Sequence, residues 1–215
     1  METELIVGAA VFDILAGEWD ALAERGMTDT PFQTLAYQRA WWTHLQPPDS
    51  TLLTVIARDA AGTLAAIGCF YNFGGKLFFN GCVEETDYLD LIAPPEDAVA
   101  GWRAVLDGLE GVIDPPWVGL ELCNIPEASP SRSVLAALAR ERGYTFHEEL
   151  AEVCPTITLP DSFDAYLETL DSKQRREISR KLRRAEAADI TTWTVGPDED
   201  LHAAVERFLE LLQKS

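Results

Sequence analysis

The sequence lacks the features that mark membrane and exported proteins. No apolar run approaches the roughly 20 residues that a helix needs to cross a bilayer. The N-terminus, Met-Glu-Thr-Glu, is acidic where a secretory signal is basic. The apolar stretch from Leu5 to Phe12 is followed by Asp13 rather than by a cleavage-site pattern. We therefore expect a cytoplasmic protein without a membrane span.

Cysteine and histidine are scarce, and neither forms a cluster. The three histidines lie far apart, and the cysteines stand singly inside apolar segments, at Cys69, Cys82, Cys123 and Cys154. This spacing indicates neither a metal pair nor a disulfide framework. We expect buried free thiols and no metal site. A Walker loop, a Rossmann fingerprint and a nucleophile elbow are missing as well.

Basic residues are few and unevenly placed. The chain has 17 Lys and Arg against 36 Asp and Glu, a formal net charge of −19. Nucleic-acid binding is disfavoured for such a chain, because phosphate recognition needs a positive surface. Between Lys173 and Arg184, however, seven of the 17 basic residues stand with Glu177 as their one acidic neighbour. The charge is therefore strongly polarised.

The remaining composition is that of an ordinary globular protein, with 47% apolar and 25% charged residues. Apolar periodicity and turn residues predict an α/β layout with an antiparallel meander over residues 51–93. The expected strands are 5–12, 52–58, 63–71, 76–82, 88–92, 117–122, 144–147 and 190–195, with an extended segment at 151–159. The expected helices are 17–25, 30–45, 94–109, 129–143, 162–170, 172–188 and 198–212.

One helix start is strongly marked. Thr30-Pro31-Phe32-Gln33 offers a threonine cap, proline at the first helical position and glutamine three residues after the cap. We expect a helix to begin there and to run to about Leu45. Helical spacing assigns Trp41 and Trp42 to the core of the protein rather than to the stacking of a sugar or a base.

Four groups of residues follow one another along nearly the whole chain. They are Thr30-Pro31-Phe32-Gln33 with Trp41-Trp42; Thr86-Asp87-Tyr88-Leu89-Asp90-Leu91; Cys154-Pro155 with Leu159-Pro160 and Phe163 to Leu170; and Ser172-Lys173-Gln174-Arg175-Arg176 with Arg180 to Arg184. In this order and spacing the chain resembles the CelD-type group of GNAT-superfamily acetyltransferases, which are linked to cellulose or exopolysaccharide biosynthesis. That group is similar in plan to the FemABX aminoacyltransferases, with two GNAT-like lobes in tandem.

The resemblance implies an α/β (α+β) fold, with a GNAT-like mixed, largely antiparallel sheet flanked by helices. It implies a first lobe over residues 1–150. The opening elements of a second lobe would then occupy residues 151–215 and include the basic helix 172–188.

The function implied by the resemblance is N-acyl transfer from acetyl-CoA or another acyl-CoA to an amine. The acceptor would be a small molecule, a nucleotide sugar or a peptide in cell-envelope metabolism. A GNAT site binds the CoA pyrophosphate on backbone N–H groups of a glycine-containing loop at a helix N-terminus. Residues 91–97 correspond to that loop, but they contain two prolines, two acids and no glycine. We expect the first lobe to be degenerate for CoA, the second cofactor loop to fall beyond Ser215, and this chain alone to be inactive.

Two sets of residues are candidates for substrate binding. Asp87, Tyr88 and Asp90 follow an expected core strand, where carboxylates could act as a general base toward an amine, although a turn would have the same composition. Arg176, Arg180, Arg183 and Arg184 lie on one side of the basic helix, opposite its apolar residues. They would bind an anionic substrate or, alternatively, form a solvated face that pairs with the acidic first lobe.

The last expected helix supports a second hypothesis. Its apolar residues form one stripe at Leu201, Val205, Phe208 and Leu212. Such a stripe needs a partner, so the chain could instead be a non-catalytic binding or assembly module that docks through its C-terminal helices, on another protein or on a second copy of itself. Nucleic-acid binding through the basic helix is a third and weaker hypothesis.

Overall fold

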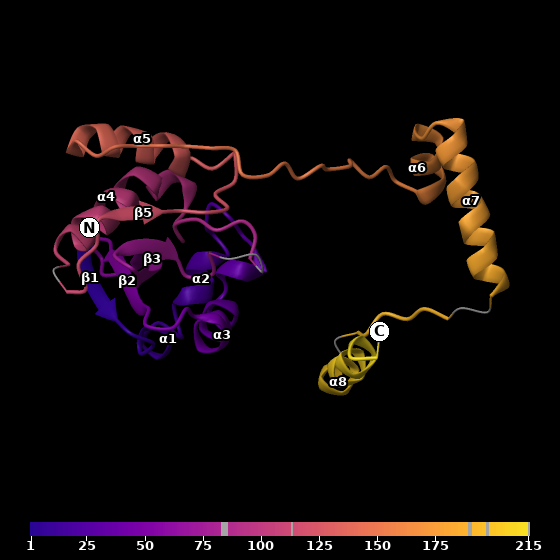
Figure 1. Cartoon of the computed structure of the whole chain (residues 1–215), viewed down its shortest axis with the longest axis horizontal. Helices are drawn as coiled ribbons and strands as arrows, with labels where there is room; N and C mark the ends of the chain where they lie inside the picture. Colours follow the sequence, from indigo (N-terminus) through magenta and orange to yellow (C-terminus); the bar gives the residue numbers. More distant parts are fainter. Residues whose placement is uncertain (83–85, 113, 189–190, 197, 215) are drawn as a thin grey trace. The chain divides into compact units, whose positions relative to one another are not determined.

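The structure, a computed structural model, describes residues 1–82, 86–112, 114–188, 191–196 and 198–214. The chain divides into two units, Met1–Glu152 and Val153–Ser215. We call them unit 1 and unit 2 and treat each by itself (Figure 1). Whether either unit is GNAT-like stays a prediction.

Unit 1 is built on a five-stranded mixed sheet. Its strands lie in chain order, and every neighbouring pair is antiparallel except the last, β4 with β5, which is parallel. The strands are β1 (Glu2–Val7), β2 (Thr51–Arg58), β3 (Leu64–Phe73), β4 (Lys76–Phe79) and β5 (Gly119–Glu121). The expected mixed, largely antiparallel α/β fold is therefore confirmed.

Helices cover both faces of this sheet (Figure 1). Alternate residues of β2 and β3 enter two apolar clusters, one packed against α4 and α5 and the other against α1, α2 and α3. The helices are α1 (Val11–Ile14), α2 (Trp19–Ala23), α3 (Leu35–Leu45), α4 (Ala98–Glu110) and α5 (Ser131–Arg142), with 3-10 turns η1 (Pro31–Gln33) and η2 (Pro95–Asp97). Burial on both faces explains why β2 and β3 are continuous apolar runs rather than alternating patterns. Trp41 and Trp42 belong to the core, as expected.

The capping box expected at Thr30 does not form. Residues Pro31–Gln33 make only the turn η1, and α3 begins after Thr34, whose hydroxyl accepts a hydrogen bond from the Tyr37 backbone N–H at 3.3 Å. The Gln33 side chain points into the core instead, where its amide donates to the Asp90 carbonyl at 2.6 Å. The Gln33 side chain therefore bonds to a distant part of the chain, and it does not return to the Thr30 backbone N–H as a capping box requires.

Several expected strands are also wrong. In the segment expected as strand 88–92, Ile92 forms an isolated bridge to Ile67, and Tyr88 has a left-handed backbone with φ 54°. Phe12, expected at the end of the first strand, lies in α1. No strand forms in 144–147, 151–159 or the described part of 190–195, because these segments find no pairing partner among the described residues.

Among its described residues, unit 2 contains three helices: α6 (Phe163–Thr169), α7 (Ser172–Ala187) and α8 (Leu201–Leu212). Each begins with a side-chain cap, from Ser162, Asp171 and Asp200 respectively, whose oxygen accepts backbone N–H groups of the first turn. The described residues of these helices include no buried side chain. Local signals define these helices, and tertiary packing within unit 2 does not cover them.

Candidate functional site

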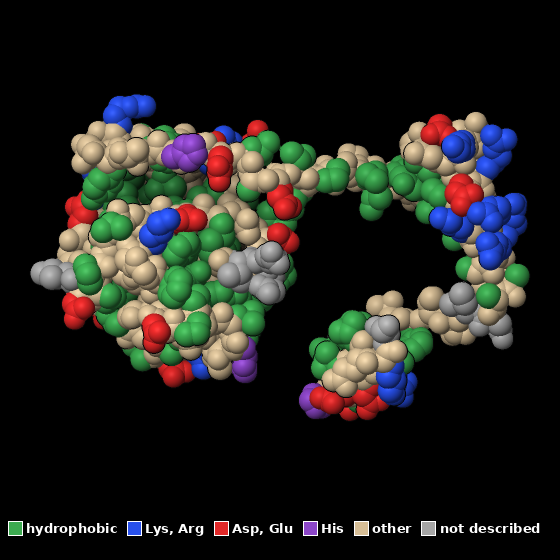
Figure 2. All heavy atoms as spheres, in the orientation of Figure 1, with side chains coloured by type: hydrophobic (Ala, Val, Ile, Leu, Met, Phe, Trp, Pro, Cys, Tyr) green, Lys and Arg blue, Asp and Glu red, His purple; other side chains and the backbone are tan. Residues whose placement is uncertain are grey.

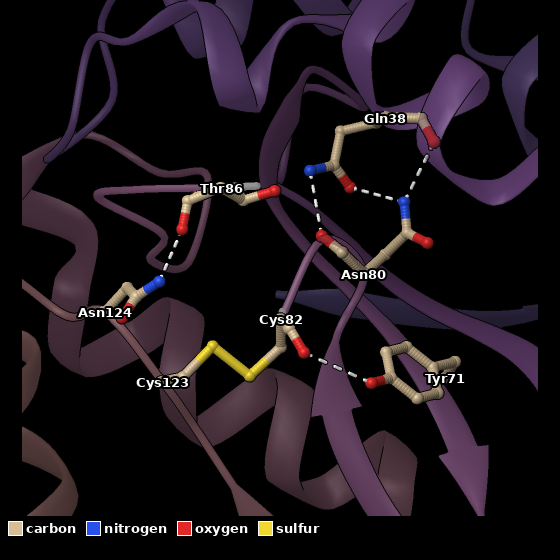
Figure 3. The surroundings of a disulfide bond; sticks show 7 residues. All are labelled: Gln38, Tyr71, Asn80, Cys82, Thr86, Cys123 and Asn124. Carbon is tan, nitrogen blue, oxygen red and sulfur yellow. Dashed lines mark hydrogen bonds between the residues drawn. A yellow bond between two sulfur atoms is a disulfide. The ribbon is translucent and has the colours of Figure 1, made fainter. Parts of the chain in front are cut away.

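The segment that contains Asp87 and Tyr88 is an arch with two buried ends. Thr86 and Leu89 are each 1% exposed, whereas Asp87 and Tyr88 between them are exposed. Asn124 holds both ends. Its side-chain amide donates to the Thr86 carbonyl at 2.5 Å (Figure 3), and its own carbonyl accepts from the Leu89 N–H at 3.1 Å. We refer to residues 86–89 as the arch. It presents one carboxylate and one phenol to solvent.

A disulfide lies beside the arch. Cys82 and Cys123 are bonded, with their Cα atoms 5.9 Å apart, so the expectation of free thiols is wrong for this pair (Figure 3). They meet because β4 and β5 are parallel neighbours and both cysteines follow the ends of these strands. A separation of 41 residues gave no local signal of this contact. Cys69 is free and buried, as expected, whereas Cys154 is free but exposed.

Asp90 faces the interior and is 3% exposed. Its carboxylate accepts hydrogen bonds from the hydroxyl of Ser129, from that of Ser131 at 2.5 Å and from the Leu91 N–H at 2.7 Å. Burial raises the pKa of Asp90, and these hydrogen bonds offset part of the rise. The carboxylate has three partners within the fold, which favours a structural role for it. Asp87 is left as the exposed carboxylate of the expected pair.

The surroundings of Asp90 form a polar core network that the sequence did not indicate. Ser131 accepts a hydrogen bond from the Trp102 indole at 2.6 Å, and Gln33 accepts one from the Thr28 hydroxyl. A cavity of about 10 Å³ beside Gln33 and Asp90 has room for no more than a water-sized molecule. It is far smaller than a substrate pocket, which typically has about 300 Å³ or more.

The start of α4 is unsuited to binding a phosphate group. Pro94 and Pro95 have no N–H to donate, and the Asp97 N–H already donates to the Pro94 carbonyl at 3.0 Å. Glu96 and Asp97 place two carboxylates in this first turn. A helix N-terminus favours anions through free N–H groups and its dipole, but here the donors are few and the local charge is negative.

The basic residues of unit 2 gather along α7 (Figure 2). Glu177 pairs with Arg180 at 2.7 Å and lies 3.8 Å from Lys181, which holds the pKa of Glu177 below its usual value. Arg176 donates to the Ser172 carbonyl at 2.9 Å. Within the described part of the chain, Arg183 and Arg184 form no ion pair with a carboxylate. The seven basic residues of α7 outnumber its two carboxylates, Glu177 and Glu186, so the helix exposes a net positive charge.

The sequence-predicted residues thus fall into separate places. Asp87 and Tyr88 are exposed on the arch, Asp90 is buried beneath it, and Arg176, Arg180, Arg183 and Arg184 all lie on α7 in unit 2. The described residues include no group of His, Cys, Asp and Glu that could hold a metal ion. None of the helices in the described ranges is both long and apolar enough to cross a membrane.

Comparisons with known proteins identify no relative. No family model, no curated protein and no solved structure matches this chain.

Proposed function

We propose that this chain forms the substrate-side part of a GNAT-type N-acyltransferase. The reaction would transfer an acyl group from acyl-CoA to an amine in cell-envelope or exopolysaccharide metabolism, in the cytoplasm. The proposal rests on the resemblance of the ordered sequence groups. The observation that supports it is the mixed, largely antiparallel sheet of unit 1 with helices on both faces, which is the architecture that the resemblance implies.

Unit 1 is proposed to contact the acceptor rather than acyl-CoA. Its α4 N-terminus has prolines and carboxylates where the CoA pyrophosphate would need N–H donors, so acyl-CoA does not fit there and we derive no transfer step through this unit. The arch offers Asp87 and Tyr88 as exposed polar groups, and a carboxylate of this kind can accept hydrogen bonds from an amine or a hydroxyl.

The α7 face is proposed to bind the anionic part of the acceptor. Arginine forks match phosphate geometry in a bidentate way, and Arg183 and Arg184 have no described acidic partner. A nucleotide-linked sugar fits this description. Its diphosphate would bind the guanidinium groups, and its neutral sugar would make the remaining contacts.

Calorimetry with two ligands tests these assignments. We expect the chain to show no micromolar binding of acetyl-CoA, and micromolar binding would contradict the degenerate α4 loop. We expect uridine diphosphate to bind, and the Arg183→Gln, Arg184→Gln double variant to weaken that binding at least tenfold. Arg140→Gln, an exposed arginine of α5, is the matched control. Equal affinity in the double variant would remove the substrate role of α7.

A second function, a docking module, is favoured by one observation. The apolar stripe of α8 is exposed, with Leu201 at 65%, Phe208 at 62% and Leu212 at 58% of their full areas. Burying one large apolar side chain stabilises by about 1.5–3 kcal/mol, so a partner that covers this stripe would bind favourably. A partner protein, or a second copy of the chain, could supply the cover.

Light scattering and a hydrophobic dye test the docking function. We expect concentration-dependent association or dye binding by the chain, reduced by Phe208→Ser, which removes the largest side chain of the stripe. Glu206→Gln changes the polar side of α8 and serves as the control. A stable monomer that binds no dye would argue against docking through α8.

A further inference from the structure

Cys82 and Cys123 lie just beyond the ends of two neighbouring parallel strands. β4 ends at Phe79 and β5 at Glu121, and the segments that follow them are joined by the disulfide (Figure 3). The Cα separation of 5.9 Å lies within the range of about 4.4–6.8 Å that a disulfide spans without movement of the backbone. The fold of the sheet therefore brings the two thiols into bonding range.

The residue next to Cys123 holds the arch. Asn124 makes both hydrogen bonds that fix the arch ends, to the Thr86 carbonyl and from the Leu89 N–H. Asn124 and Tyr88 both have left-handed backbones, with φ of 61° and 54°. Non-glycine residues adopt such values where the surrounding contacts hold them. The position of Asp87 and Tyr88 therefore depends on where the chain places Asn124.

The two cysteines differ from the third cysteine of unit 1. Cys82 and Cys123 are half-buried at the rim of the apolar cluster, where a small thiol or disulfide can approach them. Cys69 is buried in β3, and this burial raises the pKa of its thiol to about 12. The thiolate is the form that exchanges with disulfides, so Cys69 does not compete. Unit 1 thus contains one competent pair.

We propose that Cys82 and Cys123 are a reversible dithiol–disulfide modification site that controls how firmly the arch is held. The oxidant is a low-molecular-weight disulfide. One cysteine thiolate attacks it and forms a mixed disulfide, which releases one small thiol. The second cysteine then displaces the other small thiol and forms the Cys82–Cys123 bond. The chain loses two electrons and two protons, and the oxidant becomes two thiols. This inference holds whichever ligand the arch binds.

Reduction would release the covalent restraint on the segment after β5 that contains Asn124. The disulfide fixes Cys123 relative to Cys82. It therefore also restrains the position of the neighbouring Asn124, which bonds to the arch. With the disulfide open, the Thr86 hydroxyl still pairs with the Tyr37 hydroxyl at 2.7 Å, but residue 124 is less restrained, and local opening that breaks the two Asn124 hydrogen bonds becomes more frequent. The amide of Leu89 reports this directly, because its hydrogen bond to Asn124 must break before exchange.

The experiment measures redox state and amide exchange on the same full-length protein. A Cys154→Ser background removes the exposed thiol of unit 2. The chain is equilibrated with mixtures of oxidised and reduced glutathione, alkylated, and weighed by mass spectrometry. Amide exchange is then followed by NMR in the oxidised and the dithiothreitol-reduced forms. The amides of β2 and β3 are the internal control, and a Cys82→Ser, Cys123→Ser double variant is a second form without the bond.

We expect the pair to convert reversibly between dithiol and disulfide. On reduction, Leu89 should exchange at least about tenfold faster while β2 and β3 amides stay unchanged. Failure of the pair to form in excess oxidised glutathione would overturn the proposal. An unchanged exchange rate of the Leu89 amide on reduction would also overturn it. An equal acceleration of all amides would do the same, because the bond would then stabilise the whole of unit 1 rather than the arch. The dithiothreitol-reduced chain tests the same prediction without removing either cysteine, so the proposal can be judged even if the double variant misfolds.

Discussion

Replacing Asp90 by alanine removes the centre of the polar core network in unit 1. The carboxylate accepts from two serine hydroxyls and from the Leu91 N–H, and it is 3% exposed. Each buried donor left without a partner costs about 1–3 kcal/mol. The Ser129 and Ser131 oxygens still accept from the Ser131 N–H and the Trp102 indole, and the Ser131 hydroxyl can still donate weakly to the Met27 sulfur 3.7 Å away. We therefore expect a total loss of about 3–5 kcal/mol in the free energy of unfolding, near the lower end of the sum.

Asp90→Asn separates the charge from the shape. One oxygen of the amide still accepts hydrogen bonds, but the NH₂ group meets the Ser129 hydroxyl, which must turn away and lose its acceptor. We expect a cost of about 1–2 kcal/mol. Asp87→Ala is the matched control, because Asp87 is exposed on the same segment and its loss should change stability by less than about 0.5 kcal/mol.

The pH dependence of this cost has a definite sign. Burial raises the pKa of Asp90 in the folded chain, so above the usual carboxyl value of about 3.9 the folded state holds more protons than the unfolded state. Its contribution to stability is therefore full below that value and falls as pH rises through the raised pKa. Urea unfolding of wild type and Asp90→Asn from pH 4 to 7 measures it. The wild-type advantage should shrink as pH rises. An advantage that grows with pH, or an Asp90→Ala cost below about 1 kcal/mol, would refute this account of the site.

Three further substitutions test packing and electrostatics in unit 1, each by urea unfolding. Gly108→Ala places a Cβ 2.6 Å from the Val55 Cγ1 where α4 crosses β2, and should cost about 1–3 kcal/mol. Gly143→Ala, at φ 74° with open space around it, should cost about 1 kcal/mol from the backbone alone. Arg142→Met breaks ion pairs to two α4 carboxylates at 2.6 Å and should cost about 1 kcal/mol, less in high salt, whereas Arg140→Met should have little effect. A cost for Gly143→Ala larger than the cost for Gly108→Ala would contradict the distinction between backbone strain and steric clash.

The parts of the fold that the sequence predicts are those defined by local signals. β2 and β3 are apolar runs between turn residues, and the hairpin after β3 turns at Gly74 and Gly75, both with positive φ. The helix expected to end at residue 143 does end there, at Gly143, whose left-handed backbone is typical of a glycine that ends a helix. In unit 2 the helix expected over 162–170 forms, with Ser162 as its N-cap. Such features depend on a few consecutive residues.

The features that the sequence does not predict depend on residues far apart. Asp90 meets Ser129 and Ser131 across 39 and 41 residues, so nothing next to Asp90 indicates that it is buried. Gln33 donates to the Asp90 carbonyl across 57 residues and is thereby lost to the expected cap of α3. The Cys82–Cys123 pair likewise needs β4 beside β5.

These long-range contacts meet beyond the ends of β4 and β5, and this has a consequence for function. The arch is exposed at Asp87 and Tyr88, yet the residues on either side are fixed by Asn124 and by the Asp90 network. A segment held at both ends can present side chains in one arrangement, as recognition of a ligand requires, without a pocket of its own. Buried Asp90 thus helps to fix the position of the exposed residues, and a carboxylate whose pKa is raised by burial need not be the one that contacts a ligand.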